Sequence, residues 1–162
     1  PIFNNVYKEI SATKPAEILY KSSIESPSDI AVENSQKILE KLLVNRGAEI
    51  ERGLTLCGPH RDDLILMLGD HQVKGYASHG ESWSIALALK LSTYQLLKND
   101  GADPILILDD VFSELDEERR DHLAIIAKSA EQTIITVAVD SDLPKSLSGE
   151  KFLVKSGCVT KL

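Results

Sequence analysis

Two carboxylates, Asp109 and Asp110, are the residues best placed to do chemistry, because they end the apolar run 105–108 that follows Pro104. A continuous apolar run of this kind predicts a strand that is buried on both faces. Open α/β sheets bind ligands outside the carboxyl ends of their strands. Carboxylates at that place could hold Mg²⁺ on a nucleotide, since Mg²⁺ takes one or two carboxylates together with phosphate oxygens. The alternative is a strand that simply ends in solvated acids.

The two acids would have different tasks. Asp109 would hold the metal, directly or through water. Asp110 lies one residue further on and points differently, so it would orient or deprotonate an attacking water.

A second candidate is the segment Ser78-His79-Gly80-Glu81-Ser82, which opens a helix expected over 81–98. A serine and a glycine at a helix start offer a hydroxyl and free backbone N–H groups to an anion, and the glycine allows close approach. The alternative is an ordinary serine N-cap with an acidic first turn. Glu81 adds negative charge, which an anion site does not favour.

Two further segments have both a structural and a functional interpretation. Ser113 and Asp116 have the spacing of a capping box, but they lie just after the acidic strand. The segment 58–63 predicts a turn, in which His60 and Arg61 would contact phosphate or pair with the adjacent acids. Spacing does not decide between these two roles.

A phosphate-binding loop is missing from the sequence. No Gly-x-x-x-x-Gly-Lys-Ser/Thr motif appears, so we expect the chain by itself not to bind ATP well. The chain also begins at Pro1 rather than at Met, so we expect a fragment of a larger protein.

Bulk composition bounds the possible functions. The 162 residues carry a net charge of −7, which argues against an autonomous DNA-binding module. Cys57 and Cys158 lie far apart without metal-ligand spacing, which is typical of reduced thiols in a cytoplasmic protein. No apolar run is long enough to span a bilayer.

The elements that must position these residues follow from periodicity and turn signals. We expect a strand and a turn within 2–20 and a helix from Asp29 to residue 45. Short strands are expected at 53–57, 64–68 and 72–76, and a helix at 81–98 with a C-cap at 99–101. After it we expect a strand at 104–111, a helix at 116–130, a strand at 133–139 and a terminal hairpin at 151–162. This order predicts an α/β arrangement that is parallel at its centre.

Three segments together resemble a known family: Gly-Pro-His-Arg-Asp-Asp-Leu at 58–64, the loop at 77–82, and the acidic strand with its continuation at 104–116. They resemble the C-terminal half of RecF-like proteins, which belong to the ABC-type ATPase superfamily that includes SMC proteins. The resemblance implies a partial ABC-type ATPase, with central, largely parallel strands flanked by helices and a helical and hairpin N-terminal region. Residues 1–76 would form that region, and 77–162 would carry the signature loop, Walker B, the D-loop and the last strands, as one structural unit.

The resemblance also implies a function. RecF-like proteins bind DNA in an ATP-dependent way in recombinational repair, the SOS response and replication restart, and help to load recombinase at single-strand gaps with RecO and RecR. ATP binding joins two subunits head to tail, and each nucleotide lies between the Walker A loop of one subunit and the signature loop of the other. Hydrolysis in the family is slow, and without Walker A this chain alone would be inactive.

Residue roles at the nucleotide follow from the same resemblance. Ser78 and Gly80, with Glu81 beside them, would contact the γ-phosphate of the partner subunit's nucleotide. Asp109 would hold Mg²⁺ and Asp110 would act on the water. The family often has Arg or Gln where this chain has His79 and Glu81.

Three more residues receive roles in this way. Ser113 and Asp116 would lie at the dimer seam beside the nucleotide. Thr136 matches the strand end where related ATPases carry a switch histidine, which implies γ-phosphate sensing, although by its residue type alone it would be a core residue.

Two other functions stay open. One is the C-terminal half of a different ABC- or SMC-type ATPase that organises DNA, and the segment 58–63 favours the RecF-like interpretation over it. The other is a non-catalytic interaction module whose acidic strand end is structural. The missing Met and the missing Walker A argue against that module.

Overall fold

The computed structural model describes residues 1–11 and 14–162, and the chain divides into two compact units. Unit 2 is Ala16–Ala77, and unit 1 combines the described residues of Pro1–Pro15 with Ser78–Leu162. The N-terminal residues thus join the unit that follows residue 77, whereas the boundary expected after residue 76 grouped them with the preceding region.

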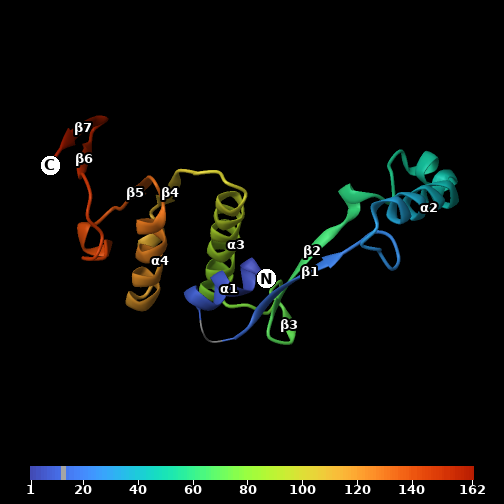
Figure 1. Cartoon of the computed structure of the whole chain (residues 1–162), viewed down its shortest axis with the longest axis horizontal. Helices are drawn as coiled ribbons and strands as arrows, with labels where there is room; N and C mark the ends of the chain where they lie inside the picture. The colour runs from blue at the N-terminus through green and yellow to red at the C-terminus, as the bar shows by residue number, and fades with distance from the viewer. Residues whose placement is uncertain (12–13) are drawn as a thin grey trace. The chain divides into compact units, whose positions relative to one another are not determined.

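Unit 2 is built on an antiparallel sheet with a long helix inserted between two of its strands (Figure 1). Strand β1 (Ala16–Lys21) pairs with β2 (Asp63–Leu68), which pairs in turn with the short β3 (His71–Gln72). Helix α2 (Ala31–Arg52) and the 3-10 turn Pro59–Arg61 come between β1 and β2. The buried apolar residues of this unit are Ala16, Ile24, Cys57 and Leu68.

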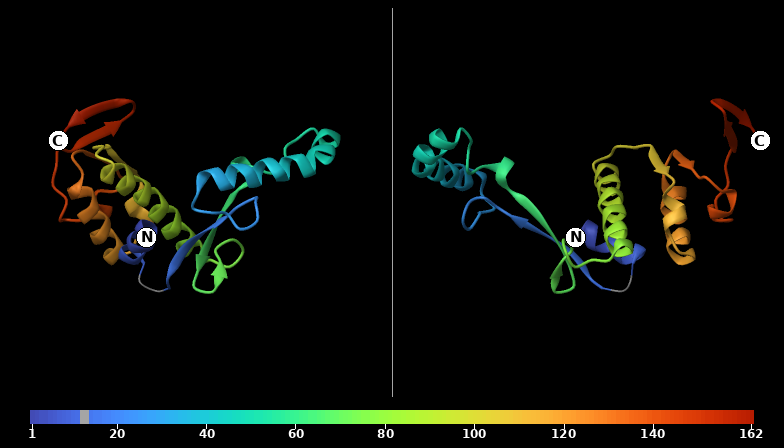
Figure 2. Two further views of the ribbon diagram at one scale, coloured as in Figure 1. Left: turned by 45° about the vertical axis from the view of Figure 1, so that its right-hand side comes forward. Right: turned by 180° about the vertical axis from the view of Figure 1, so that it is seen from behind.

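Unit 1 contains three helices and a parallel strand pair. Helix α1 (Ile2–Ile10) contacts both α3 (His79–Asn99) and α4 (Glu117–Ser129), as Figure 2 shows from two further sides. Strand β4 (Leu106–Asp109) pairs in parallel with β5 (Thr133–Thr136), and the hairpin β6 (Phe152–Lys155) and β7 (Cys158–Lys161) ends the unit. Its core includes Phe3, Val6, Tyr7, Ile10, Ile85, Ala88, Leu91, Leu108, Phe112, Leu123, Ala124 and Ala127.

The β4–α4–β5 connection positions the acidic strand end. Parallel strands need a crossover, here α4, and this brings the carboxyl ends of both strands to one edge. The register places Asp109 beside Thr136 at that edge. The expected strands at 64–68, 104–111 and 133–139, the helices at 81–98 and 116–130, the hairpin and the parallel pairing are confirmed, with shifts at their ends.

The expectation that the acidic strand is buried on both faces is wrong for this chain. Leu106 and Leu108 are buried, but Ile107 is 64% exposed and its parallel partner Ile134 is 46% exposed. Side chains alternate between the faces of a strand, and only one face of this pair is covered within the chain.

Other expectations fail near the N-terminus. The segment 2–20 contains its expected strand only at its end, as β1. The first part of the segment forms α1 instead, because Phe3, Val6, Tyr7 and Ile10 recur at helical spacing and pack inward. Residues 12 and 13 of the expected strand and turn lie outside the described residues.

The helix α2 also departs from its expected bounds. Asp29 does not cap it, because Ile30 occupies the N-cap position without a side-chain bond, and the helix continues to Arg52. It ends at Gly53, whose φ of +66° is the left-handed conformation that favours glycine.

Two of the expected short strands are missing or shortened. The strand at 53–57 does not form, because the chain folds back on α2, where the Leu56 N–H donates to the Glu49 carboxylate at 2.6 Å. The strand at 72–76 is confined to β3, because a turn closes through the bond from the Tyr76 N–H to the Val73 carbonyl. Among the described helices, none combines the length and apolar character needed to cross a membrane.

Candidate functional site

The carboxyl ends of β4 and β5 hold Asp109, Asp110 and Thr136 in one hydrogen-bonded group. The Thr136 hydroxyl donates to the Asp109 Oδ1 at 2.5 Å. The Asp110 backbone N–H donates to the Thr136 Oγ1 at 3.1 Å and to the Thr136 carbonyl at 3.2 Å. The parallel register therefore brings Thr136, which lies 26 residues after Asp110, into hydrogen-bonding distance of the two adjacent acids.

Asp110 lies where the strand turns sharply. Its φ of +51° and ψ of 26° are left-handed values that residues other than glycine adopt rarely. Its carbonyl accepts the Ser113 hydroxyl at 2.8 Å, and no described residue bonds its carboxylate. The Asp110 carboxylate is therefore open to solvent beside Asp109.

The expected capping box between Ser113 and Asp116 is wrong, because Ser113 bonds back to Asp110 instead. Ser113 lies in the 3-10 turn Val111–Glu114, and α4 begins at Glu117. Its N-cap is Asp116, whose Oδ1 accepts the Arg119 N–H at 3.0 Å. Ser113 thus holds the backbone of the turn after Asp110, and Asp116 caps the start of α4.

Arg120 holds the same segment from α4, and sequence inspection gave no indication of this. Its Nε donates to the carbonyls of Phe112 and Leu115, each at 2.8 Å, and its Nη2 contacts Asp142 at 3.3 Å. Asp142 follows β5, so one side chain links the segment after β4 with the segment after β5. An arginine inside a charged run carries no sign of such a role.

The start of α3 has Ser78 as its N-cap, as the alternative interpretation predicted, and the cap is a full capping box. The Ser78 Oγ accepts the Glu81 N–H at 3.3 Å, and the Glu81 Oε2 accepts the Ser78 N–H at 2.9 Å. The other carboxylate oxygen of Glu81 forms an ion pair with Lys14 at 3.0 Å. The Ser78 N–H and the Lys14 ammonium together lower the pKa of Glu81 from 4.5 to about 2.

These bonds change the role of Glu81 in the site. Its charge, which counted against an anion site, is balanced by Lys14, and both of its oxygens are engaged within the loop. The Ser78 hydroxyl accepts the Glu81 N–H, and its own hydrogen bond to the Glu81 carboxylate also helps to lower the pKa of Glu81. A Cβ added at Gly80 would meet nothing within 4 Å, so the packing of this chain does not require a glycine there.

The donor set at Asp109 suits a metal that is shared with phosphate. Among the described residues, no three His, Cys, Asp or Glu side chains gather to enclose an ion. Mg²⁺ on a nucleotide needs only one or two carboxylates, and no described residue donates to the Asp109 Oδ2. Asp109 therefore fits a magnesium ligand whose other partners are phosphate oxygens and water.

In unit 2, the segment 58–63 is a turn fastened by Asp62. The Tyr20 hydroxyl and the Ser23 N–H, the latter at 2.6 Å, donate to its carboxylate and lower its pKa. Neither His60 nor Arg61 forms an ion pair with a described acid. The His60 ring lies 2.7 Å from the Thr55 hydroxyl, and the Arg61 Nε donates to the Thr55 carbonyl at 2.7 Å.

The fold of this chain also occurs in solved structures. No family model matches the chain. Two structures of the recombination mediator RecF in the RecFOR pathway, one with ATP and one described as RecF-ATPrS, match with a TM-score of 0.77 and 28% identity over 99% of the chain. The chain has the fold of RecF. It spans 42% of the chain in the ATP structure and 43% of the chain in the other, less than half of their length.

SMC ATPases share this fold at lower similarity. A structure from work on ATP-driven dimerization and DNA-stimulated activation of SMC ATPases matches with a TM-score of 0.55 and 14% identity, over 99% of this chain and 80% of that one. An Smc head domain of Pyrococcus furiosus matches with a TM-score of 0.57 and 15% identity, over 99% of this chain and 33% of that one. The resemblance to RecF and the α/β ATPase fold expected from the sequence are confirmed.

Proposed function

We propose that this chain is the C-terminal half of a RecF-like ATPase and carries one half of a shared nucleotide site. The observation that carries the proposal is the group of Asp109, Asp110 and Thr136 at the carboxyl ends of β4 and β5, in a chain with the fold of RecF. In this role Asp109 holds Mg²⁺, the Walker B task, and Asp110 orients the attacking water.

The start of α3 serves the nucleotide of a second subunit. The Ser78 hydroxyl, turned from Glu81 to the ligand, and the backbone N–H groups around Gly80 would contact the γ-phosphate there. Glu81 acts on the loop instead of the phosphate, because its oxygens bond Ser78 and Lys14. Ser113 and Asp116 shape the segment that lies at the dimer seam.

The open face of the strand pair indicates where the rest of the ATPase belongs. Asp109 lies two residues beyond Ile107, and therefore on the same exposed face as Ile107 and Ile134. A part of the protein that covers these isoleucines would lie beside Asp109. We assign the missing phosphate-binding loop to that part.

The wider role follows from the same assignment. The protein would bind double-stranded DNA, gaps or junctions and support recombinase loading with RecO and RecR in recombinational repair. The net charge of −7 assigns the main DNA-binding surface to other parts of the whole protein. A DNA-organising SMC-type ATPase is the second candidate, and the higher identity and TM-score of RecF favour the first.

Gly80 offers a sharp test of the contact with the second subunit. In the whole protein, we expect Gly80→Val to leave the fold and melting temperature intact, because the position is open, and to abolish ATP-dependent dimerisation, because a side chain would separate the loop from the phosphate. Light scattering after gel filtration, with and without ATP, measures the dimer.

Gly47→Val is the matched control. Gly47 is also helical and also has open space around it, but it lies in α2 of unit 2. The control should dimerise like the wild type. Normal ATP-dependent dimerisation of the Gly80 variant would refute the role in the second subunit, and full hydrolysis by Asp109→Asn would refute the ATPase assignment itself.

A further inference from the structure

We propose that Thr136 is a positioning residue that fixes Asp109 and Asp110 through its single hydroxyl, in place of sensing phosphate itself. The inference rests on the proposed function, because it gives the two acids their catalytic setting. By its residue type alone Thr136 was expected in the core, and that expectation is wrong, because Thr136 is exposed at the strand end.

Two hydrogen bonds join Asp110, Thr136 and Asp109 in a continuous chain. The Asp110 N–H donates to the Thr136 Oγ1 at 3.1 Å, and the same hydroxyl donates its proton to the Asp109 Oδ1 at 2.5 Å. A hydroxyl has one proton and two lone pairs, so both bonds can exist at once. With its proton committed to Asp109, Thr136 acts through that carboxylate.

Both acids need such support because neither is held by packing. Asp109 and Asp110 are exposed, and Asp110 has a left-handed φ of +51°, which costs free energy unless neighbouring groups over-determine it. The bond from Thr136 occupies Oδ1 of Asp109 and so fixes the side-chain rotamer of Asp109. The same rotamer sets the direction of the unoccupied Oδ2. The Asp110 N–H divides its bond between this hydroxyl and the Thr136 carbonyl at 3.2 Å, so the hydroxyl helps to fix the turn that sets the direction of the second carboxylate.

The register makes the arrangement specific to this threonine. Asp109 and Thr136 are directly paired in the parallel sheet, so the hydroxyl reaches the carboxylate without a water between them. Thr133, at the other end of β5, instead donates to the Ala127 carbonyl at 2.7 Å. Both threonines of β5 thus donate one side-chain hydrogen bond, but only the bond from Thr136 reaches an acid of the candidate site.

The test compares Thr136→Val, which keeps the shape and loses the hydroxyl, with Thr136→Ser, which keeps the hydroxyl, in the whole protein. Thr133→Val is the matched control. Without nucleotide, we expect moderately faster hydrogen exchange of the Asp110 amide in Thr136→Val, in which this amide keeps only its bond to the carbonyl of residue 136, and wild-type exchange in Thr136→Ser. With Mg²⁺ and ATP, we expect kcat to fall about tenfold in Thr136→Val, as for the loss of one charge-assisted hydrogen bond, with restoration by serine.

The outcomes separate this inference from the proposed function. If Thr136→Val exchanges and hydrolyses like the wild type while Asp109→Asn is inactive, the positioning role is wrong and the ATPase assignment stands. If serine fails to restore kcat, the methyl group matters instead of the hydroxyl, and the inference is overturned. If Asp109→Asn hydrolyses ATP normally, the proposed function fails. The exchange of the Asp110 amide in Thr136→Val then still tests whether the Thr136 hydroxyl holds Asp110.

Discussion

Single residues at this site act mainly on each other. Glu81 is the clearest case, since its carboxylate accepts the Ser78 N–H and pairs with Lys14, so that a charge unsuited to an anion site becomes part of the loop. Ser78 caps the helix, and in the proposed function its hydroxyl also bonds phosphate. Gly80 has no structural requirement within the chain, and this is what makes it informative about a ligand.

The lowered pKa of Glu81 predicts a pH-dependent contribution to stability. Because the pKa falls from 4.5 to about 2 on folding, the ionised carboxylate stabilises the folded state fully above about pH 4.5 and loses this effect as the pH falls towards 2. We expect Glu81→Gln to lower the melting temperature at pH 7 and to approach the wild type near pH 2. Circular dichroism melts across this range measure the difference.

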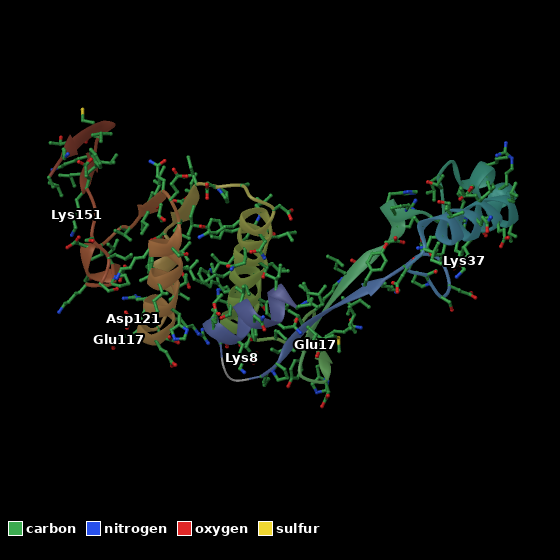
Figure 3. All side chains as sticks on the ribbon, in the orientation of Figure 1. Lys8, Glu17, Lys37, Glu117, Asp121 and Lys151 are labelled. Carbon is green, nitrogen blue, oxygen red and sulfur yellow. The ribbon has the colours of Figure 1, made fainter. Side chains whose placement is uncertain are left out.

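Glu17 provides the control for that series. It is an exposed glutamate on β1 in unit 2, labelled in Figure 3, and Glu17→Gln should change the melting temperature little at any pH. A Glu81→Gln deficit that stays constant down to pH 2 would assign the effect to packing instead of charge.

At the scale of elements, α4 holds the segment that precedes it. The Arg120 side chain reaches back from the helix to the carbonyls of Phe112 and Leu115, and sideways to Asp142 after β5. Acidic residues such as Glu117 begin the helix, which suits the positive end of its dipole, and Figure 3 labels Glu117 and Asp121 on its first turns. The helix is thus a crossover between two strands and also a brace for the loop after the first.

Arg120→Ala should weaken both stability and assembly. The Leu115 carbonyl loses the Arg120 donor, and the Phe112 carbonyl keeps only the Leu115 N–H, so we expect the free energy of unfolding to fall by about 1–3 kcal/mol. Because the 112–115 segment would lie at the dimer seam, ATP-dependent dimerisation of the whole protein should weaken as well. Urea unfolding and light scattering measure the two effects.

The neighbouring Arg119 gives a matched comparison. It has an ion pair with Asp116 at 3.4 Å, within its own first turn, and its side chain bonds none of the carbonyls that Arg120 holds. Arg119→Ala should therefore leave dimerisation unchanged. Equal losses in the two variants would indicate a general effect on α4 and argue against a specific brace.

At the scale of the whole molecule, the strand pair of unit 1 has one buried face and one solvent-exposed face. Leu108 is 3% exposed on the first, and Ile107 is 64% exposed on the second. An isolated two-stranded sheet with an apolar face is marginal in water. We therefore expect the open face to be buried in the whole protein.

Ile107→Ala separates these two states. In this chain alone, where Ile107 is exposed, the free energy of unfolding should change by less than about 0.5 kcal/mol. In the whole protein it should fall by roughly 2–5 kcal/mol, because a buried side chain is lost. Denaturant unfolding of both forms makes the comparison, and Leu108→Ala, which should destabilise both, is the control. An equally small effect of Ile107→Ala in both forms would leave the face uncovered and contradict the assignment.

The sequence by itself determined the features that depend on neighbouring residues. The run before Asp109 specified β4, the spacing of Ser78 and Glu81 specified the start of α3, and the glycine at 101, with a φ of +85°, marked its end. Signals of this kind are local, because caps and turns form between residues a few positions apart. A local pattern gave a wrong prediction where another bonding partner competed. Ser113 was expected to cap the helix, but it bonds Asp110, and Asp116 caps the helix instead.

Only the tertiary structure decided how those features meet. The pairing of Asp109 with Thr136, of Glu81 with Lys14 and of Arg120 with Asp142 joins residues 27, 67 and 22 positions apart. Strand register, helix packing and the burial of one face set such pairs, and no residue spacing encodes them. The sequence therefore indicated the residues that we propose act on a nucleotide. The fold determined which neighbouring residues bond them and set their positions.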